Sequence, residues 1–204
     1  MKELSNTTEE KIMEAAKEVF IKYGLYGARM QDIADNACIN KALLHYYFRS
    51  KEKLFDKIFE GALQKYFKQL DVFSDASLPV KQRILKYVEN VIDFYSEYPQ
   101  MSIFIIKEIS LNPELFKEKV QAIKRTSGVK LIEALEEGIA SGEIKKIDTT
   151  LFLINLQSLC SYPFIAAPMF KYSLKSHNKD WDKDFSIEKL KKSVKEFVDL
   201  KLSK

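Results

Sequence analysis

Residues 28–55 constrain the fold more than any other part of the chain. Apolar residues at three- and four-residue spacing predict one short helix that begins near Met30 and another over residues 41–47. Asn40 precedes the second of these and suits its N-cap position. Two short helices joined by a tight turn at a steep angle form a helix-turn-helix, so we expect that motif here.

The rest of the chain also shows helical spacing. Thr7 and Glu10 have the spacing of a capping box for a first helix, and Ser50 suits the N-cap of a helix that begins at Lys51. The 204 residues include only 6 Gly and 5 Pro, and no segment alternates polar and apolar residues as a strand would. The sequence therefore predicts an all-α chain of about nine helices, the later ones over residues 80–97, 114–140, 149–170 and 187–202.

Composition narrows the class of protein. With 46% hydrophobic and 30% charged residues, the chain suits a soluble globular fold. Cys38 and Cys160 fit no metal-ligand spacing, and the N-terminus has no apolar signal segment, so we expect a reduced, cytoplasmic protein without metal or cofactor. The sequence lacks a Gly-rich phosphate loop, a His-Glu metal pair and a nucleophile elbow, so we expect no enzymatic activity.

One segment raises the alternative of a membrane anchor. Residues 149–170 carry no charge and are long enough to cross a bilayer. However, the segment contains Asn155 and Gln157, as well as Pro163 and Pro168. We therefore expect a helix buried in a protein interface, and no membrane partner.

The charge around the second short helix is locally basic. The net charge of +4 is small, and residues 1–60 hold as many acidic as basic side chains. Between residues 36 and 51, however, the cations Lys41, Arg49 and Lys51 occur without any acidic residue. Cations suit phosphates, and short or apolar side chains suit base edges in a major groove. The candidate DNA-contacting residues are Arg29, Asn40, Lys41, Ala42, Leu43, His45, Tyr46, Tyr47, Lys51 and Lys53.

These residues resemble the DNA-binding domain of TetR-family transcriptional regulators. The resemblance covers about residues 8–60 without a gap, and many positions of different chemistry agree in order. The matching residues are Ala16, Phe20, Gly24, Asp32, Ile33, Ala34, Ala37, Ile39, Asn40, Lys41, Ala42, Leu44, Tyr47, Phe48, Ser50, Lys51, Glu52, Lys53 and Leu54.

The resemblance implies a function and a division of the chain. It implies a helix-turn-helix DNA-binding domain over residues 1–52 and a helical ligand-binding and dimerisation domain over residues 53–204. The expected function is a homodimeric repressor that a small-molecule effector, in part apolar, releases from a palindromic operator. The alternative is a small-molecule-binding helical dimer whose head does not read DNA.

Three positions depart from the family pattern. Cys38 stands where the family usually has Gly in the turn, which would be strained if its φ angle is positive. Leu43 replaces a common Thr, which exchanges a hydroxyl for an apolar contact and should shift base preference. The order His45-Tyr46 reverses the usual one, so the roles of these two residues are open.

The body contains many aromatic residues that are either core or pocket lining. The resemblance implies an apolar ligand pocket, with Asn155, Gln157 and Tyr162 as its more suitable polar groups. The candidate pocket residues are Phe94, Tyr95, Met101, Phe104, Phe116, Asn155, Tyr162 and Trp181. The resemblance also implies that the last helices pair with a second subunit, and the candidate interface residues are Leu159, Phe164, Ile187, Leu190, Val194 and Phe197.

Overall fold

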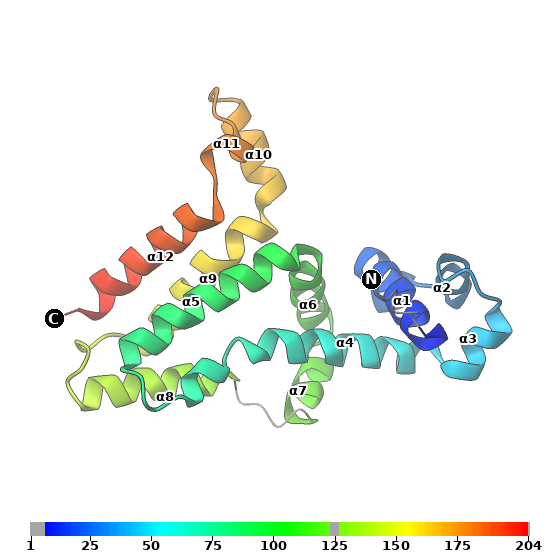
Figure 1. The fold of residues 1–204 in the computed structure, drawn as a ribbon, viewed down its shortest axis with the longest axis horizontal. Coiled ribbons are helices and arrows are strands. Elements are labelled where there is room, and N and C mark those ends of the chain that lie inside the picture. Colours follow the sequence, from blue (N-terminus) through cyan, green and yellow to red (C-terminus); the bar gives the residue numbers. More distant parts are fainter. Residues whose placement is uncertain (1–6, 123–126, 204) are drawn as a thin grey trace, which may run out of the picture. The chain divides into compact units, whose positions relative to one another are not determined.

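The computed structural model describes residues 7–122 and 127–203, and within them every regular element is a helix (Figure 1). The described residues form twelve α-helices and one short 3₁₀ helix, η1 (Asp71–Ser74), rather than about nine helices. The predicted all-α class is confirmed. The count is higher than predicted because two segments predicted as single helices are each divided in two. A further short helix lies between two predicted helices, as described below.

The chain divides into two compact units. The first unit comprises Met1–Gln64 and Ile103–Lys119, and the second comprises Lys65–Ser102 and Val120–Lys204. All three boundaries fall inside helices, namely α4 (Lys51–Lys68), α6 (Pro99–Leu111) and α7 (Pro113–Ala122), so each of these helices supplies residues to both units. The division predicted after residue 52 concerns domain function and stays a prediction.

Local capping interactions define the helices of the first unit. Helix α1 (Thr8–Gly27) begins with the predicted capping box, in which Thr7 and Glu10 exchange hydrogen bonds. Helices α2 (Met30–Asn36) and α3 (Lys41–Tyr47) form the predicted pair. Asn40 caps α3, and the Ser50 hydroxyl accepts from the Lys53 amide at the start of α4, so all three predicted caps are confirmed.

Four phenylalanine rings form the core of the first unit. Phe55 on α4 packs edge-on against Phe20 of α1, with ring centroids 5.1 Å apart, and stacks with Phe59 at 5.7 Å. Phe104 of α6 contacts both Phe55 and Phe59. Aromatic pairs of this geometry add to the free energy of burying their apolar area. Helix α7 (Pro113–Ala122) is attached through Lys119, whose ammonium lies 3.2 Å from Asp56 and 2.9 Å from Glu60.

The turn between α2 and α3 is a Schellman motif with cysteine at the left-handed position. The Ile39 amide donates to the Ala34 carbonyl and the Cys38 amide to the Asp35 carbonyl, which is the hydrogen-bond pattern of that motif. Cys38 has a φ of 54°, and a positive φ is the condition under which the sequence predicted strain at this residue. Glycine is the usual residue here because a Cβ is crowded in this conformation.

We therefore predict that Cys38→Gly stabilises the protein by about 1 kcal/mol, since it removes the left-handed strain at a modest cost in unfolded-state entropy. Chemical denaturation measures the change in the free energy of unfolding. Asn178, with a φ of 56°, provides the control. Because asparagine tolerates this conformation better, Asn178→Gly should gain less. An equal or smaller gain at position 38 would contradict the strain argument.

Gly24 introduces a kink inside α1 beside a buried carboxyl group. Its φ of 70° and ψ of −178° are not helical, so α1 continues to Gly27 through a kink at this residue. A Cβ at Gly24 would lie 3.1 Å from Oε1 of Glu108 on α6. Glu108 is 1% exposed, and Oε1 has no hydrogen-bond partner among the described residues. Burial raises the pKa of this carboxyl.

We predict that Glu108→Gln stabilises the protein at neutral pH by about 1 kcal/mol, because the amide carries no charge to bury. The folded-state pKa of Glu108 is raised, so the folded protein binds a proton at a higher pH than the unfolded chain does. The cost of Glu108 therefore decreases as the pH falls through that pKa, and the advantage of the variant should shrink from pH 7 to pH 5. Denaturation midpoints at both pH values test this prediction, with the exposed Glu118→Gln as control. A pH-independent advantage would refute it.

In the second unit, α12 (Ile187–Leu202) lies along α5 (Val80–Glu97) (Figure 1). Val194, Val198 and Leu202 of α12 are buried. Ion pairs add to this contact, since Lys191 pairs with Asp93 at 2.7 Å and Lys195 pairs with Glu89. The remaining helices of this unit are α8 (Ser127–Ala140), α9 (Thr149–Ile165), α10 (Ala167–Lys175) and α11 (Trp181–Asp184).

Two of the long helices that the sequence predicts are divided. The predicted helix over residues 114–140 corresponds to α7 and α8, and residues 123–126 between them lie outside the described residues. The uncharged segment 149–170 forms α9 and the start of α10, which are bent by 70°. Pro168 lies in the first turn of α10, a position where proline starts helices readily.

The segment between the predicted helices 149–170 and 187–202 contains the short helix α11, which accounts for part of the higher helix count. Among the described residues, no single helix has the length and hydropathy of a membrane span. Helices α9 and α10 reach those values only when they are taken together across their bend.

Candidate nucleic-acid interface and ligand pocket

Helix α3 exposes almost all of its side chains. Leu44 is the one fully buried residue of this seven-residue helix, with 0% exposure. Phe48, one helical turn later, is also buried and anchors the C-terminal end. The six other residues of α3 are exposed, and they are the six candidates that the sequence places there: Lys41, Ala42, Leu43, His45, Tyr46 and Tyr47.

The first turn of α3 is held by Asn40. Its Oδ1 accepts a hydrogen bond from the Leu43 amide at 2.7 Å, while the residue itself stays exposed. The first turn contains Lys41 and no acidic residue. The rings of Tyr46 and Tyr47 meet edge to face, with centroids 5.5 Å apart. The exposed surface therefore combines a cation, an apolar side chain and hydrogen-bonding groups on one short helix.

The three flanking candidates have different surroundings. Arg29 is exposed immediately before α2, and Lys53 is exposed in the first turn of α4. Lys51 is half-buried, and its ammonium donates to the Ala28 carbonyl at 3.1 Å. Lys51 therefore holds the end of α1 as well as carrying a positive charge, a structural role that the sequence did not indicate.

We predict that Asn40→Ala lowers the free energy of unfolding by about 1 kcal/mol, because the helix loses its side-chain cap. Asn40→Ser is the matched comparison, since serine also caps helices well and should retain most of the stability. Chemical denaturation of the two variants provides the measurement. Equal losses in both variants would show that capping is not the reason for the change.

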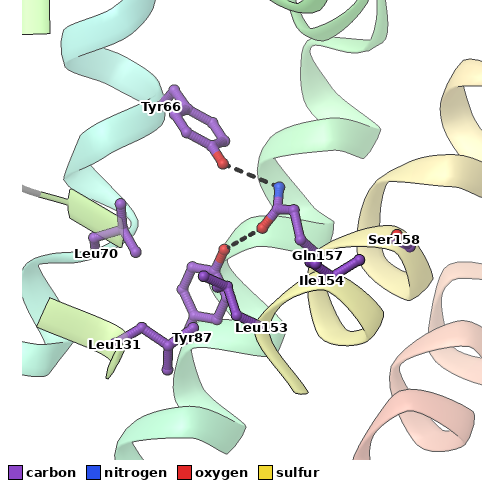
Figure 2. Close-up of a pocket in the computed structure, with 8 residues that line it drawn as sticks. All are labelled: Tyr66, Leu70, Tyr87, Leu131, Leu153, Ile154, Gln157 and Ser158. Atoms are coloured by element: carbon purple, nitrogen blue, oxygen red, sulfur yellow. Dashed lines mark hydrogen bonds between the residues drawn. The ribbon is translucent and has the colours of Figure 1, made fainter. Parts of the chain in front are cut away.

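A pocket of about 360 Å³ lies in the second unit (Figure 2). It is an open pocket lined by residues of α5, α8 and α9 together with the C-terminal end of α4 and the residue Leu70 that follows. Its lining residues are Tyr66, Leu70, Tyr87, Leu131, Leu153, Ile154, Gln157 and Ser158. The volume falls within the range of small-molecule sites in proteins.

The amide of Gln157 organises three tyrosines beside this pocket. Its Nε2 donates to the hydroxyl oxygens of Tyr66 at 3.0 Å and Tyr95 at 2.7 Å. Its Oε1 accepts from the Tyr87 hydroxyl at 2.6 Å. Figure 2 shows the hydroxyls of Tyr66 and Tyr87 approaching the two ends of the amide. Burial raises the pKa of all three phenols, so each remains neutral near pH 7.

None of the eight residues predicted to line a ligand pocket lines this one, and their role in ligand binding stays a prediction. Phe104 and Phe116 belong to the first unit, and Phe104 is part of its aromatic core. The remaining six lie in the second unit but outside the lining: Phe94, Tyr95, Met101, Asn155, Tyr162 and Trp181. Of these, Tyr95 comes nearest, through its hydrogen bond to Gln157.

Three of the other predicted pocket residues have identifiable contacts. Trp181 stacks on Phe185, with ring centroids 4.2 Å apart, and also contacts Phe170. Tyr162 is exposed and meets Phe170 edge-on. Asn155 lines a second hollow of about 520 Å³ with residues that include Leu151, Phe152 and Phe197. Gln157 is the polar candidate that does lie in the pocket.

The residues predicted for a dimer interface differ in their exposure. Leu159 on α9 is 39% exposed, whereas Phe164, Ile187, Leu190 and Phe197 are half-buried. Val194 is 1% exposed and is therefore already covered within its own chain, which removes it from the predicted interface. Exposed apolar residues that the prediction omitted include Leu151 and Ile154 on α9 and Leu200 on α12.

The described residues contain neither a candidate metal site nor a disulfide. No group of three or more His, Cys, Asp or Glu side chains within residues 7–122 and 127–203 could hold a metal ion. Cys38 is exposed and Cys160 is buried, and burial raises the pKa of the Cys160 thiol to about 12.

Comparisons of sequence agree with the helix-turn-helix geometry. The family described as "Bacterial regulatory proteins, tetR family" matches residues 12–58, which include α2, α3 and most of α1. The HTH-type transcriptional repressor NicS of Pseudomonas putida is 28% identical over 174 residues, which is 85% of this chain and 79% of NicS. The matched proteins are transcriptional regulators and not enzymes, in agreement with the predicted lack of catalytic activity.

Comparisons of structure extend the similarity to the whole fold. The TetR family regulator PfmR of Thermus thermophilus aligns with a TM-score of 0.68 at 20% identity, covering 92% of this chain and 96% of PfmR. FadR of Bacillus subtilis, solved in complex with stearoyl-CoA, aligns with a TM-score of 0.65 at 21% identity and covers 93% and 97% of the two chains. At these identities the alignments establish a shared fold.

Proposed function

Because the chain belongs to the TetR family of bacterial transcriptional regulators, we propose that it is a homodimeric repressor that a small molecule releases from a palindromic operator. The observation that carries this proposal is the exposure of α3: six of its seven residues are exposed, and Leu44 alone is fully buried. A relative named as a repressor, NicS, supports the direction of regulation. A regulator of this kind must reach bacterial DNA, so we expect it to act in the cytoplasm.

We assign the contacts on DNA according to the chemistry of each side chain. Lys41, Lys53 and Arg29 are exposed cations that suit phosphates, and Lys51 adds charge beside Ala28. Ala42 permits close approach of the helix, and Leu43 suits a thymine methyl group. The remaining candidates, which can hydrogen-bond to bases or phosphates, are Asn40, His45, Tyr46 and Tyr47.

A dimer with two-fold symmetry presents two α3 helices to the operator. Half-sites one helical turn apart require recognition helices about 34–36 Å apart, in successive major grooves. Leu159 of α9 supports an interface on this helix, because it is exposed and apolar, as are Leu151 and Ile154. Burial of such residues against a second copy would stabilise the dimer.

Helix α4 is the proposed route from ligand to DNA. It begins at Lys51, beside the end of α1, and its later residue Tyr66 lines the pocket. A ligand that displaces Tyr66 acts on the same continuous helix that begins in the DNA-binding unit. It favours release only if it binds the DNA-incompetent shape more tightly than the competent one. The stearoyl-CoA bound to FadR supports a small-molecule effector in this fold.

We predict that Lys41→Ala weakens binding to every duplex, because a dimer loses two phosphate contacts. The slope of log affinity against log salt concentration should become less steep by about 2. Fluorescence anisotropy with labelled duplexes at several salt concentrations provides the measurement. Lys146→Ala, which removes an exposed lysine from the second unit, is the control and should leave the slope unchanged.

An unchanged slope for Lys41→Ala would reject its phosphate contact. If the unmodified protein also showed no salt-dependent DNA binding, the result would favour the alternative, a ligand-binding dimer whose head does not read DNA.

A further inference from the structure

The pocket of about 360 Å³ in the second unit is open on its α9 side. Three of its lining residues, Leu70, Tyr87 and Leu131, are buried. On α9, by contrast, Ile154 is 54% exposed and Ser158 is also exposed. Both residues line the pocket and reach solvent as well, so the opening lies beside them (Figure 2).

Ile154 and Ser158 belong to an exposed stripe that runs along α9. Its members recur at three- and four-residue spacing, which places them on one face of the helix. We call this set the α9 stripe, and its members are Leu151, Ile154, Asn155, Ser158, Leu159 and Tyr162. No residue of α9 is charged. An exposed helix face that is largely apolar and carries no charge is typical of a protein interface.

A second copy of this chain suits the α9 stripe. In a two-fold dimer the same surface lies on both sides of the interface, so it must be complementary to itself. An uncharged stripe meets this condition, because two copies of it do not repel each other. Helix α12 packs beside α9, where Phe197 stacks on Phe152, and its exposed charges are balanced. These are Glu188, Glu196 and Asp199 against Lys189, Lys192 and Lys201.

We propose that a second copy of the chain covers the α9 stripe and closes the opening of the pocket, so that the ligand site is complete only in the dimer. The inference rests on the homodimer of the proposed function and deepens it. A ligand enclosed in this way binds the dimer more tightly than the monomer. By linkage it strengthens the dimer by the same factor, and so acts directly on the contact between the two copies.

Analytical ultracentrifugation of the full-length chain over a range of concentrations tests the occupant of the α9 stripe. Leu159→Glu adds a charge to the stripe at an exposed residue that does not line the pocket. It should weaken the dimer about 100-fold or more, because a charge without a partner is costly to bury. Leu111→Glu makes the same change at an exposed leucine of α6 and should leave the dimer unchanged. An equally tight dimer in Leu159→Glu would overturn the proposal.

Reaction of introduced thiols with iodoacetamide tests whether the second copy closes the pocket. The background variant is Cys38→Gly, because Cys38 is exposed whereas Cys160 is buried. Ser158→Cys places a thiol at the opening, and Leu153→Cys places one in the lining but outside the α9 stripe. Both thiols should react about ten-fold or more slowly in the dimer than after Leu159→Glu, because only transient opening then exposes them.

Ser110→Cys, at an exposed position of α6 outside the pocket, is the matched control and should react equally fast with and without Leu159→Glu. The added carboxylate disfavours a nearby thiolate, so it cannot by itself produce the expected increase in rate. Protection at Ser158→Cys alone would show that the second copy covers α9 without closing the pocket. That result would overturn the proposal, and so would equal rates in dimer and monomer for both thiols.

Sedimentation and DNA binding together separate this inference from the proposed function. A dimer that binds DNA and is not weakened by Leu159→Glu overturns the closure of the pocket and leaves the regulator intact. An unmodified chain that stays monomeric at every concentration overturns the homodimer of the proposed function, and this inference with it.

Discussion

Burial of Leu44 determines which side chains the protein can present on α3. A helix of seven residues is too short to be stable alone, so its orientation depends on tertiary anchors. Leu44 and Phe48 supply those anchors on one face, and Asn40 closes the first turn. Every other residue of the helix is then left exposed, so these anchors determine which six side chains of α3 the protein presents as candidate DNA contacts.

The second unit is organised around one polar group in an apolar setting. The Gln157 amide forms hydrogen bonds with three tyrosines, of which Tyr87 and Tyr95 are buried and Tyr66 is half-buried, so substitution of any of them removes one partner of this amide. Tyr66 belongs to α4, which begins in the other unit. The same hydrogen-bond network that shapes the pocket therefore involves the helix through which we propose that a ligand acts.

Sequence reasoning succeeded where local interactions decide the structure. The caps at Thr7, Asn40 and Ser50 depend on residues within one helical turn, and all three form as predicted. The strain predicted at Cys38 also depends only on local backbone geometry. The sequence predicted strain if the φ angle of Cys38 is positive, and it is positive.

Sequence reasoning failed where the role of a residue depends on distant partners. Phe104 has the same apolar character whether it lines a pocket or packs against Phe55, and periodicity cannot distinguish the two. Lys191 and Lys195 have the charge expected of a solvent-facing helix side, yet acidic residues of α5 pair with them. A usable signal was present at Tyr87, since a tyrosine within the buried stripe of α5 requires a polar partner, and Gln157 is that partner.

Selection of bound duplexes from a random DNA library, with the purified full-length chain, tests the central claim most directly. The account predicts enrichment of one near-palindromic sequence, with half-sites about one helical turn apart, because two copies of α3 must lie in successive major grooves. Failure of a folded protein to enrich any sequence would contradict the claim that α3 reads DNA.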